Sequence, residues 1–296
     1  MTRHGRNRSQ GWRHAKLDGH ANENEFANEL VSDESIKSEI ERYFWKKGLL
    51  TNFSVSVDGA KQVRSIFGDL TVSKVDIIMT KSEQDPLNIS LKKSENGQVW
   101  LISVPRFIAA MEFHLGMKTS REVRTGISLF IGGANLAEFQ SQFEEALSQS
   151  FRDSPRIAIQ EQRQKRLVAQ TIKQNFPTIW NSTIEFFNQN LPLITRLAFS
   201  QGLAESSEDA ANVLIYNKAS QGQRVFPVVA LVDAVTNLIP SRPVAPGPKN
   251  GGSTLLFPTG FLQMHHPQGE NQMQFHHQYR KILSLKPTSL SKSELL

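Results

Sequence analysis

Residues 68–98 read GDLTVSKVDIIMTKSEQDPLNISLKKSENGQ, and this stretch decides the fold that we predict for the chain. It contains an apolar run with one acid at residues 75–79, then a polar turn, and then a second strand at residues 87–92. Strands joined by so short a connection are expected to pair in antiparallel fashion. We therefore expect two neighbouring strands at the centre of the fold.

The polar residues of these two strands indicate where chemistry could take place. Side chains alternate between the two faces of a strand, so Ser90 and Lys92 share the face opposite Ile89 and Leu91. Asp76 lies on the neighbouring strand. The pair of strands can therefore present a carboxylate, a hydroxyl and an ammonium group at one shared edge.

The form Lys-x-Asp-Ile followed by Ile-Ser-Leu-Lys-Lys resembles the PD-(D/E)-x-K nuclease superfamily, most strongly over residues 20–115. In that family an acid on one strand and an acid-x-Lys on the next hold a divalent metal beside the scissile phosphate. The resemblance equates Asp76 with the first acid and Lys92 with the lysine. Ser90 stands where the family has its middle acid, as in a subset of phage and restriction-type nucleases.

This resemblance implies a fold, an activity and a set of site residues. The fold class is α/β (α+β), a restriction-endonuclease-like mixed sheet flanked by helices, with a C-terminal mixed region that ends in a β-hairpin. The activity is magnesium-dependent hydrolysis of DNA. Asp76 would hold Mg²⁺ with the carbonyl of Leu91 and a further acid from an early helix, Glu23, while Lys92 positions or helps to deprotonate the attacking water. Ser90 offers only a hydroxyl.

Alternatives stay open for these residues. Glu23 could instead complement the dipole of its helix N-terminus, and Glu95 or Asp69 could complete the metal site in its place. The lysines after Ser90 could simply discourage aggregation of an edge strand. A site without the middle acid could also be inactive, which leaves a nucleic-acid-binding or phage assembly protein as the second hypothesis.

Composition sets wider limits on the function. The chain has 296 residues, a formal net charge of +6, a pI near 9.5 and no cysteine, so disulfides, thiolate catalysis and Cys-ligated zinc are excluded. No run of 18 apolar residues occurs, and the Arg-rich N-terminus lacks the apolar core of a secretory signal. We expect a cytoplasmic protein of a bacterium or of an infected host cell.

Four segments are predicted along the chain. Residues 1–18 form a basic flexible tail, residues 19–175 the nuclease-like core, residues 176–285 a C-terminal α+β region for target recognition, and residues 286–296 a second tail. Helices are predicted near residues 22–31, 32–47, 105–116, 119–131, 135–150, 155–175 and 177–203. Strands are predicted near residues 53–57, 213–216 and 224–231, with a final hairpin of residues 253–264 and 272–282.

Basic and polar residues outside the strands are candidates for contact with DNA. They are Arg3, Arg6, Arg8, Arg13, Lys93, Arg163, Lys165 and Arg166. The resemblance adds Gln98, which stands where related nucleases tend to place a polar residue near the lysine. The competing interpretation is that the tail and the basic helix face are merely solvated. A two-fold dimer would suit double-strand cleavage.

Four histidines gather in the final hairpin: His265, His266, His276 and His277. A zinc site needs three or four converging ligands, and neighbouring residues of a strand point to opposite faces. The pattern therefore favours surface or nucleic-acid-facing histidines over a zinc site.

Overall fold

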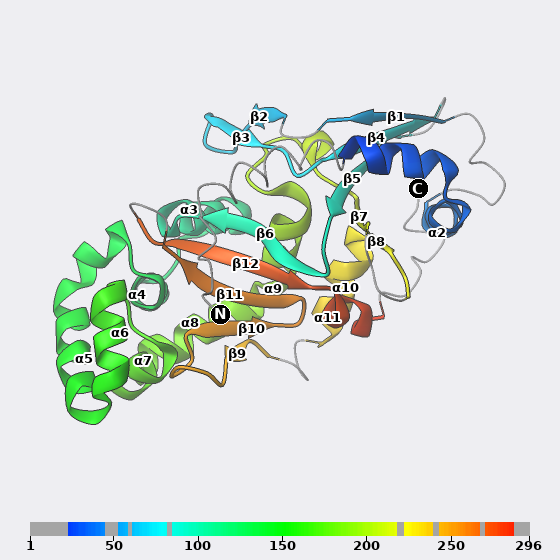
Figure 1. The fold of residues 1–296 in the computed structure, drawn as a ribbon. Helices are drawn as coiled ribbons and strands as arrows, with labels where there is room; N and C mark the ends of the chain where they lie inside the picture. The colour runs from blue at the N-terminus through cyan, green and yellow to red at the C-terminus, as the bar shows by residue number, and fades with distance from the viewer. Residues whose placement is uncertain are drawn as a thin grey trace, which may run out of the picture. The chain divides into compact units, whose positions relative to one another are not determined.

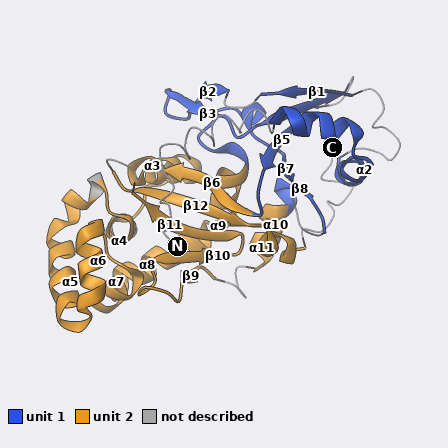
Figure 2. Ribbon diagram, in the orientation of Figure 1, with its two compact units in different colours: residues 1–95, 200–230, 288–296 blue, residues 96–199, 231–287 orange. Residues whose placement is uncertain are grey.

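The computed structural model describes residues 23–44, 53–58, 61–81, 85–217, 222–238, 243–266 and 270–286. The chain forms two compact units, coloured separately in Figure 2. Unit 1 comprises residues 1–95, 200–230 and 288–296, and unit 2 comprises residues 96–199 and 231–287. The predicted boundary after residue 175 thus falls inside unit 2. The predicted tail of residues 1–18 lies outside the described residues.

Unit 1 is built on a five-stranded mixed sheet (Figure 1). Its strands, in spatial order, are β1 (Phe53–Val57), β4 (Ile77–Lys81), β5 (Leu87–Lys92), β7 (Val213–Tyr216) and β8 (Val225–Pro227). β4 and β5 pair antiparallel as predicted, whereas β5 and β7 pair parallel. The mixed sheet and the α+β class are therefore confirmed.

One face of this sheet packs against two helices. Residues 23–32 form the first helix and α2 (Glu34–Tyr43) the second, and Asp33 caps α2 by accepting hydrogen bonds from the amides of Ser35 and Ile36. Apolar side chains at helical spacing face the sheet. The core cluster includes Phe26, Leu30, Ile36, Ile40, Ile77, Met79, Ile89, Leu91, Val213 and Ile215. Side chains at the intervening strand positions must therefore lie on the opposite face.

A short two-stranded ribbon and a long loop complete the described part of unit 1. The ribbon is β2 (Gln62–Arg64) paired antiparallel with β3 (Leu70–Val72). The loop contains the 3₁₀ turn η3 (Ser207–Asp209) and is joined to the ribbon by a bridge between Ser65 and Ala204.

Unit 2 carries an antiparallel sheet of five strands. In spatial order they are β6 (Asn96–Ile102), β12 (Gln272–Gln278), β11 (Gly260–His265), β10 (Thr254–Phe257) and β9 (Ala245–Pro246). The antiparallel pairing of β11 with β12 confirms the predicted hairpin, and the first predicted arm proves to be two strands, β10 and β11. The helix predicted near residues 105–116 is α3 (Val104–Leu115), and the strand β6 precedes it.

The remaining helices of the described chain follow one another along the sequence. These helices are α4 (Arg121–Ile131), η1 (Ala134–Phe139), α5 (Gln140–Asp153), α6 (Pro155–Gln164), α7 (Ala169–Asn175), α8 (Pro177–Gln189), α9 (Leu191–Arg196), the π-helix η2 (Leu197–Gln201), α10 (Val228–Leu238) and α11 (Tyr279–Ser284). The predicted helix of residues 155–175 is broken at Lys165, where φ is 47°. The predicted strand of residues 224–231 ends at β8 and continues as α10. Within the described ranges, no helix combines the length and the apolar character needed to cross a bilayer.

Candidate active site

Asp76 stands immediately before β4 and is held by backbone hydrogen bonds on both sides. Its amide donates to the carbonyl of Ile89 at 2.8 Å, and its own carbonyl accepts from the amide of Asp58 at 3.0 Å. The register that pairs Ile77 with Ile89 places the following residues of β5 beside Asp76. The pairing of β4 with β5 thus fixes the carboxylate relative to the second strand.

The three side chains that the sequence pattern singled out lie together on the sheet face opposite the core. The amide of Leu91 donates to Oδ2 of Asp76 at 2.6 Å, and the Ser90 hydroxyl makes a long contact of 3.5 Å to the same oxygen. Nζ of Lys92 donates to Oγ of Ser90 at 2.7 Å. An ammonium, a hydroxyl and a carboxylate therefore form one connected line.

A fourth polar residue, Lys74, belongs to this group and was not assigned a role from the sequence. Exposure alternates from residue 73 to residue 79, with Val75 buried and Lys74 partly open on the face of Asp76. Burial, reinforced by the positive charge of Lys92 and opposed by Asp76, lowers the pKa of Lys74 to about 7. Burial also lowers the pKa of Lys92, again against the attraction of Asp76.

The sequence held a signal for Lys74 in the Lys-x-Asp spacing, because alternate residues of an extended segment share a face. Its burial depends on the loop of residues 200–212, which no local pattern predicts. A Cβ built on Gly202 would lie 3.2 Å from Cε of Lys74. The backbone of this loop therefore forms a wall against the lysine stem.

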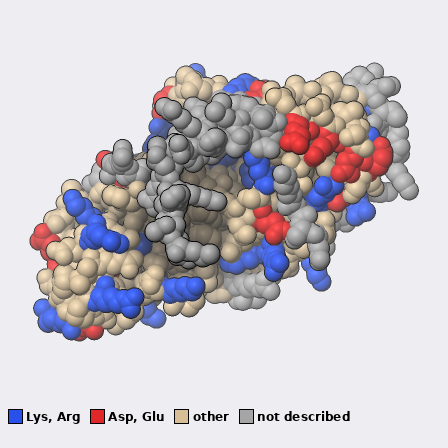
Figure 3. Space-filling view, in the orientation of Figure 1, with Lys and Arg blue, Asp and Glu red and all other residues tan. Residues whose placement is uncertain are grey.

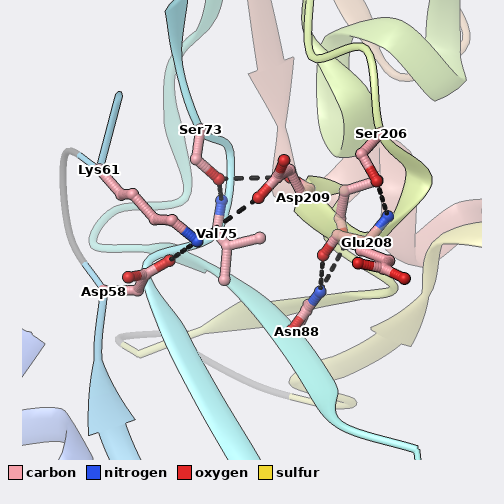
Figure 4. A network of polar contacts seen from close by, with 9 residues as sticks. Asp58, Lys61, Ser73, Val75, Asn88, Ser206, Glu208 and Asp209 are labelled. Carbon is pink, nitrogen blue, oxygen red and sulfur yellow. Dashed lines mark hydrogen bonds and ion pairs between the residues drawn. The ribbon is translucent and has the colours of Figure 1, made fainter. Parts of the chain in front are cut away.

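Figure 4 shows the polar contacts that hold this loop against the segment leading to Asp76. The Ser73 hydroxyl donates to the carbonyl of Asp209 at 3.3 Å and accepts from the amide of Val75 at 3.0 Å. The side-chain amide of Asn88 donates to the carbonyls of Glu208 at 2.7 Å and Ala210 at 3.1 Å. Both strands of the site are thus tied to one loop by buried or partly buried hydrogen bonds.

Glu23, the predicted further acid, begins the helix of residues 23–32 and is 8% exposed. Its Oε1 lies 3.4 Å from Nζ of Lys93, so the structure joins these two predicted residues to each other. Participation of Glu23 and of the Leu91 carbonyl in a metal site stays a prediction. Asp69 lies in the β2–β3 turn, where its side chain accepts from the Ser65 hydroxyl.

The donor set around Asp76 sets the terms for a metal ion. Among the residues that the structure describes, no group of three His, Asp or Glu side chains is arranged to hold a metal. Magnesium is commonly bound through one or two carboxylates, with water and substrate phosphate completing six ligands. The single carboxylate of Asp76, with the hydroxyl of Ser90 beside it, fits an ion whose remaining ligands are water and oxygens of the substrate phosphate.

Several predicted DNA contacts lie on the surface of unit 2. Arg163 and Lys165 are exposed at the end of α6, and basic side chains gather over the helices α5 to α7 on the face shown in Figure 3. Gln98 is exposed on β6, where its Oε1 accepts from the side-chain amide of Gln274 at 2.7 Å. Arg3, Arg6, Arg8 and Arg13 lie outside the described residues.

Arg166 is the clear correction among the predicted DNA contacts. It is only 4% exposed, and its Nη1 donates to the carbonyls of Phe130 at 3.3 Å and Ser253 at 3.2 Å. Its guanidinium carbon lies 5.7 Å from the ring centre of Phe130, and burial lowers its pKa to about 10 against the opposing charge of Glu161. The break at Lys165 turns Arg166 inward, so it stabilises unit 2 and is unavailable to DNA.

The four histidines do not act as one group. His277 is buried on β12, whereas His276 stacks on Phe261 with ring centres 4.5 Å apart and contacts Gln263 at 3.2 Å. Nδ1 of His266 contacts the side-chain oxygen of Asn271. Burial, with a smaller effect of His265, lowers the pKa of His276 and favours its neutral form.

The site is thus of a defined kind: a carboxylate, a hydroxyl and two lysines on one face of a mixed sheet. No family model matches the chain, and no curated protein matches it. Among solved structures, the chain is similar to the restriction endonuclease MspI in complex with its cognate DNA. The TM-score is 0.42 and the identity 13%, over 82% of this chain and 77% of that chain. The roles of Asp76, Ser90 and Lys92 are therefore supported by the geometry of these residues and not by this similarity.

Proposed function

We propose that the protein is a magnesium-dependent DNA endonuclease of restriction or phage type, with a restriction-endonuclease-like core in unit 1. The observation that carries this proposal is the connected line of Lys92, Ser90 and Asp76 on adjacent strands. The basic composition of the chain supports a phosphate-rich partner. A dimer of two such sites would cut both strands of a duplex.

Hydrolysis of a phosphodiester adds water to phosphorus, breaks the bond to the leaving oxygen and returns a proton to that oxygen. Magnesium, when held by Asp76 and phosphate oxygens, supplies positive charge that favours hydroxide formation and offsets the charge on the phosphate. Glu23 and the carbonyl of Leu91 are the proposed further ligands. Lys92 orients the attacking water and donates hydrogen bonds to the phosphate oxygens, and Ser90 fixes the position of the lysine amine.

The proposal is tested by incubating supercoiled plasmid with purified protein and magnesium. Asp76→Asn keeps an acceptor for the Leu91 amide but removes the charge, so we expect plasmid cleavage to fall by roughly a hundredfold or more. Asp85→Asn is the matched control, because Asp85 is an exposed acid just before β5. Equal cleavage by Asp76→Asn and Asp85→Asn would contradict the assignment.

One observation favours a second function, a nucleic-acid-binding or phage assembly protein without hydrolysis. Lys74, Asp76 and Lys92 lie near each other, and this set contains two amines and a single acid. Such a site could bind phosphate without a metal. It predicts DNA binding that is indifferent to magnesium and is not weakened in Asp76→Asn, with no cleavage by the unaltered protein.

A further inference from the structure

Exposed basic side chains follow one another along three consecutive helices of unit 2, and Figure 3 shows basic side chains gathered over these helices. They are Arg152 on α5, Arg156 and Arg163 on α6, Lys165 just beyond α6, and Lys173 on α7. We call these five cations the α5–α7 basic surface. In the described segment of residues 152–173 the one exposed acid is Asp153, so exposed positive charge exceeds negative charge by four. Two further exposed acids, Glu144 and Glu145, lie earlier on α5.

The cations of this surface are not neutralised by neighbouring acids. In the part of the chain that the structure describes, none of the five forms an ion pair, and the guanidinium of Arg152 donates to the neutral side chain of Gln149. Other exposed cations of unit 2 are paired. Lys118 lies 2.8 Å from Glu112, and Arg124 lies 3.9 Å from Glu138. The charge of the α5–α7 basic surface is therefore uncompensated.

The two arginines of α6 point the same way from a fixed helix. Arg156 and Arg163 are seven residues apart, which is about two turns and roughly 10 Å along the axis. The buried residues of α6, Ala158 and Glu161, lie on its opposite side. The end of α6 is held by the next residue but one, Arg166, which is buried and donates to two backbone carbonyls. The spacing of the two guanidinium groups is thus built into the fold of unit 2.

An extended polyanion fits such a surface better than a single small anion. DNA carries about one negative charge per 1.7 Å of its helix axis, so several phosphates recur over the roughly 10 Å between Arg156 and Arg163. A guanidinium can donate two parallel hydrogen bonds to phosphate oxygens. Because these arginines have no ion pair within the described residues, a phosphate could bind them without displacing an acid.

We propose that the α5–α7 basic surface binds the phosphate backbone of a DNA duplex, with Arg156 and Arg163 as its central contacts. This inference rests on the proposed function for the identity of the ligand as DNA. The surface belongs to unit 2, whereas Asp76, Ser90 and Lys92 belong to unit 1. It therefore adds an anchoring contact that depends on charge, is independent of base sequence and should appear in the salt dependence of binding.

The experiment measures the affinity of the full chain for a fluorescent DNA duplex by anisotropy, without divalent metal, over a series of salt concentrations. For the double variant Arg156→Gln with Arg163→Gln, we expect affinity to fall roughly tenfold or more at low salt, and the slope of log affinity against log salt to decrease by about two. Arg156→Lys with Arg163→Lys should keep the slope, because it keeps both charges.

Lys118→Gln with Arg124→Gln is the matched control. It removes the same two charges from unit 2, but at exposed cations that already have acidic partners. We expect this control to change the slope by less than about half of one contact. Denaturant unfolding of all variants should match that of the unaltered protein, since the altered side chains are exposed.

The outcomes separate this inference from the proposed function. A slope that falls in the Gln variant of α6, and is retained in the Lys variant and in the control, supports the surface. An equal fall in the control shows a general effect of net charge and overturns it. An unchanged slope in the Gln variant, while the unaltered protein cuts plasmid, shows that the cations are merely solvated; it overturns the surface and leaves the nuclease standing. An unaltered protein that neither binds nor cuts DNA overturns both.

Discussion

Replacing Arg166 by methionine tests whether this residue stabilises unit 2 or contacts DNA. The substitution keeps an unbranched, apolar side chain but removes the donors to the carbonyls of Phe130 and Ser253. It also removes the positive charge beside Glu161, which is fully buried. The structure therefore predicts a loss of stability and no specific loss of DNA affinity.

The size of the loss follows from opposing contributions. Hydrogen bonds from a charged donor contribute about 1.5–3 kcal/mol each, so the two carbonyl bonds of Arg166 amount to about 3–6 kcal/mol. Burial opposes them, because desolvation lowers the pKa of Arg166 to about 10 and so disfavours the charged form. We therefore expect the free energy of unfolding to fall by about 2–4 kcal/mol, somewhat less than the two hydrogen bonds alone would give.

Denaturant unfolding followed by circular dichroism measures this change, and DNA binding is measured on the same samples. Arg163→Met is the matched control on the same basic segment, since Arg163 is exposed and should change the free energy of unfolding by less than about 0.5 kcal/mol. The reasoning is refuted if Arg166→Met unfolds like the unaltered protein while its affinity for DNA drops.

Three further predictions concern charge and backbone. A double-mutant cycle of Arg166→Met with Glu161→Gln should give a coupling of about 1–3 kcal/mol in denaturant unfolding, and additive effects would contradict a buried pair. In denaturant unfolding, Gly202→Ala and Gly116→Ala should each lose about 1–2 kcal/mol, because φ is +59° and +65° at these positions. Gly202→Ala should lose more than Gly116→Ala, since its Cβ would lie 3.2 Å from Cε of Lys74, whereas a Cβ at Gly116 meets open space. Because the pKa of Lys74 is lowered to about 7, the unfolded chain binds one more proton than the folded chain above pH 7. The free energy of unfolding should therefore rise with pH between about 7 and 10 in the unaltered protein relative to Lys74→Gln. The same pH dependence in both proteins would refute the burial of the Lys74 amine.

The alternation of apolar and polar residues, together with a short polar turn, was enough to predict the strands that carry the site. Alternation in residues 53–57 and 87–92 is a local property, and the short turn before Leu87 forces an antiparallel pair, so Asp76, Ser90 and Lys92 could be brought together from the sequence. The strand of residues 96–102 was not predicted, because its apolar residues do not alternate. The apolar residues that follow Arg224 do not alternate either, so the change from β8 to α10 was not predicted.

Tertiary packing decided what the sequence could not predict. Arg166 looked like part of an exposed helix face, but the positive φ of Lys165 ends that helix and sends the next side chain inward. Lys74 became a buried amine only because residues far along the chain, around Gly202, return to cover it. Such contacts leave no periodic trace near the residue that they affect.

The most direct test of the account is the rate of plasmid cleavage by Lys92→Ala, measured with magnesium at protein concentrations that saturate DNA binding. The account predicts that DNA is still bound while the cleavage rate falls by roughly a hundredfold to a thousandfold, because the amine that orients water and contacts the phosphate is gone. Cleavage at the rate of the unaltered protein would contradict it.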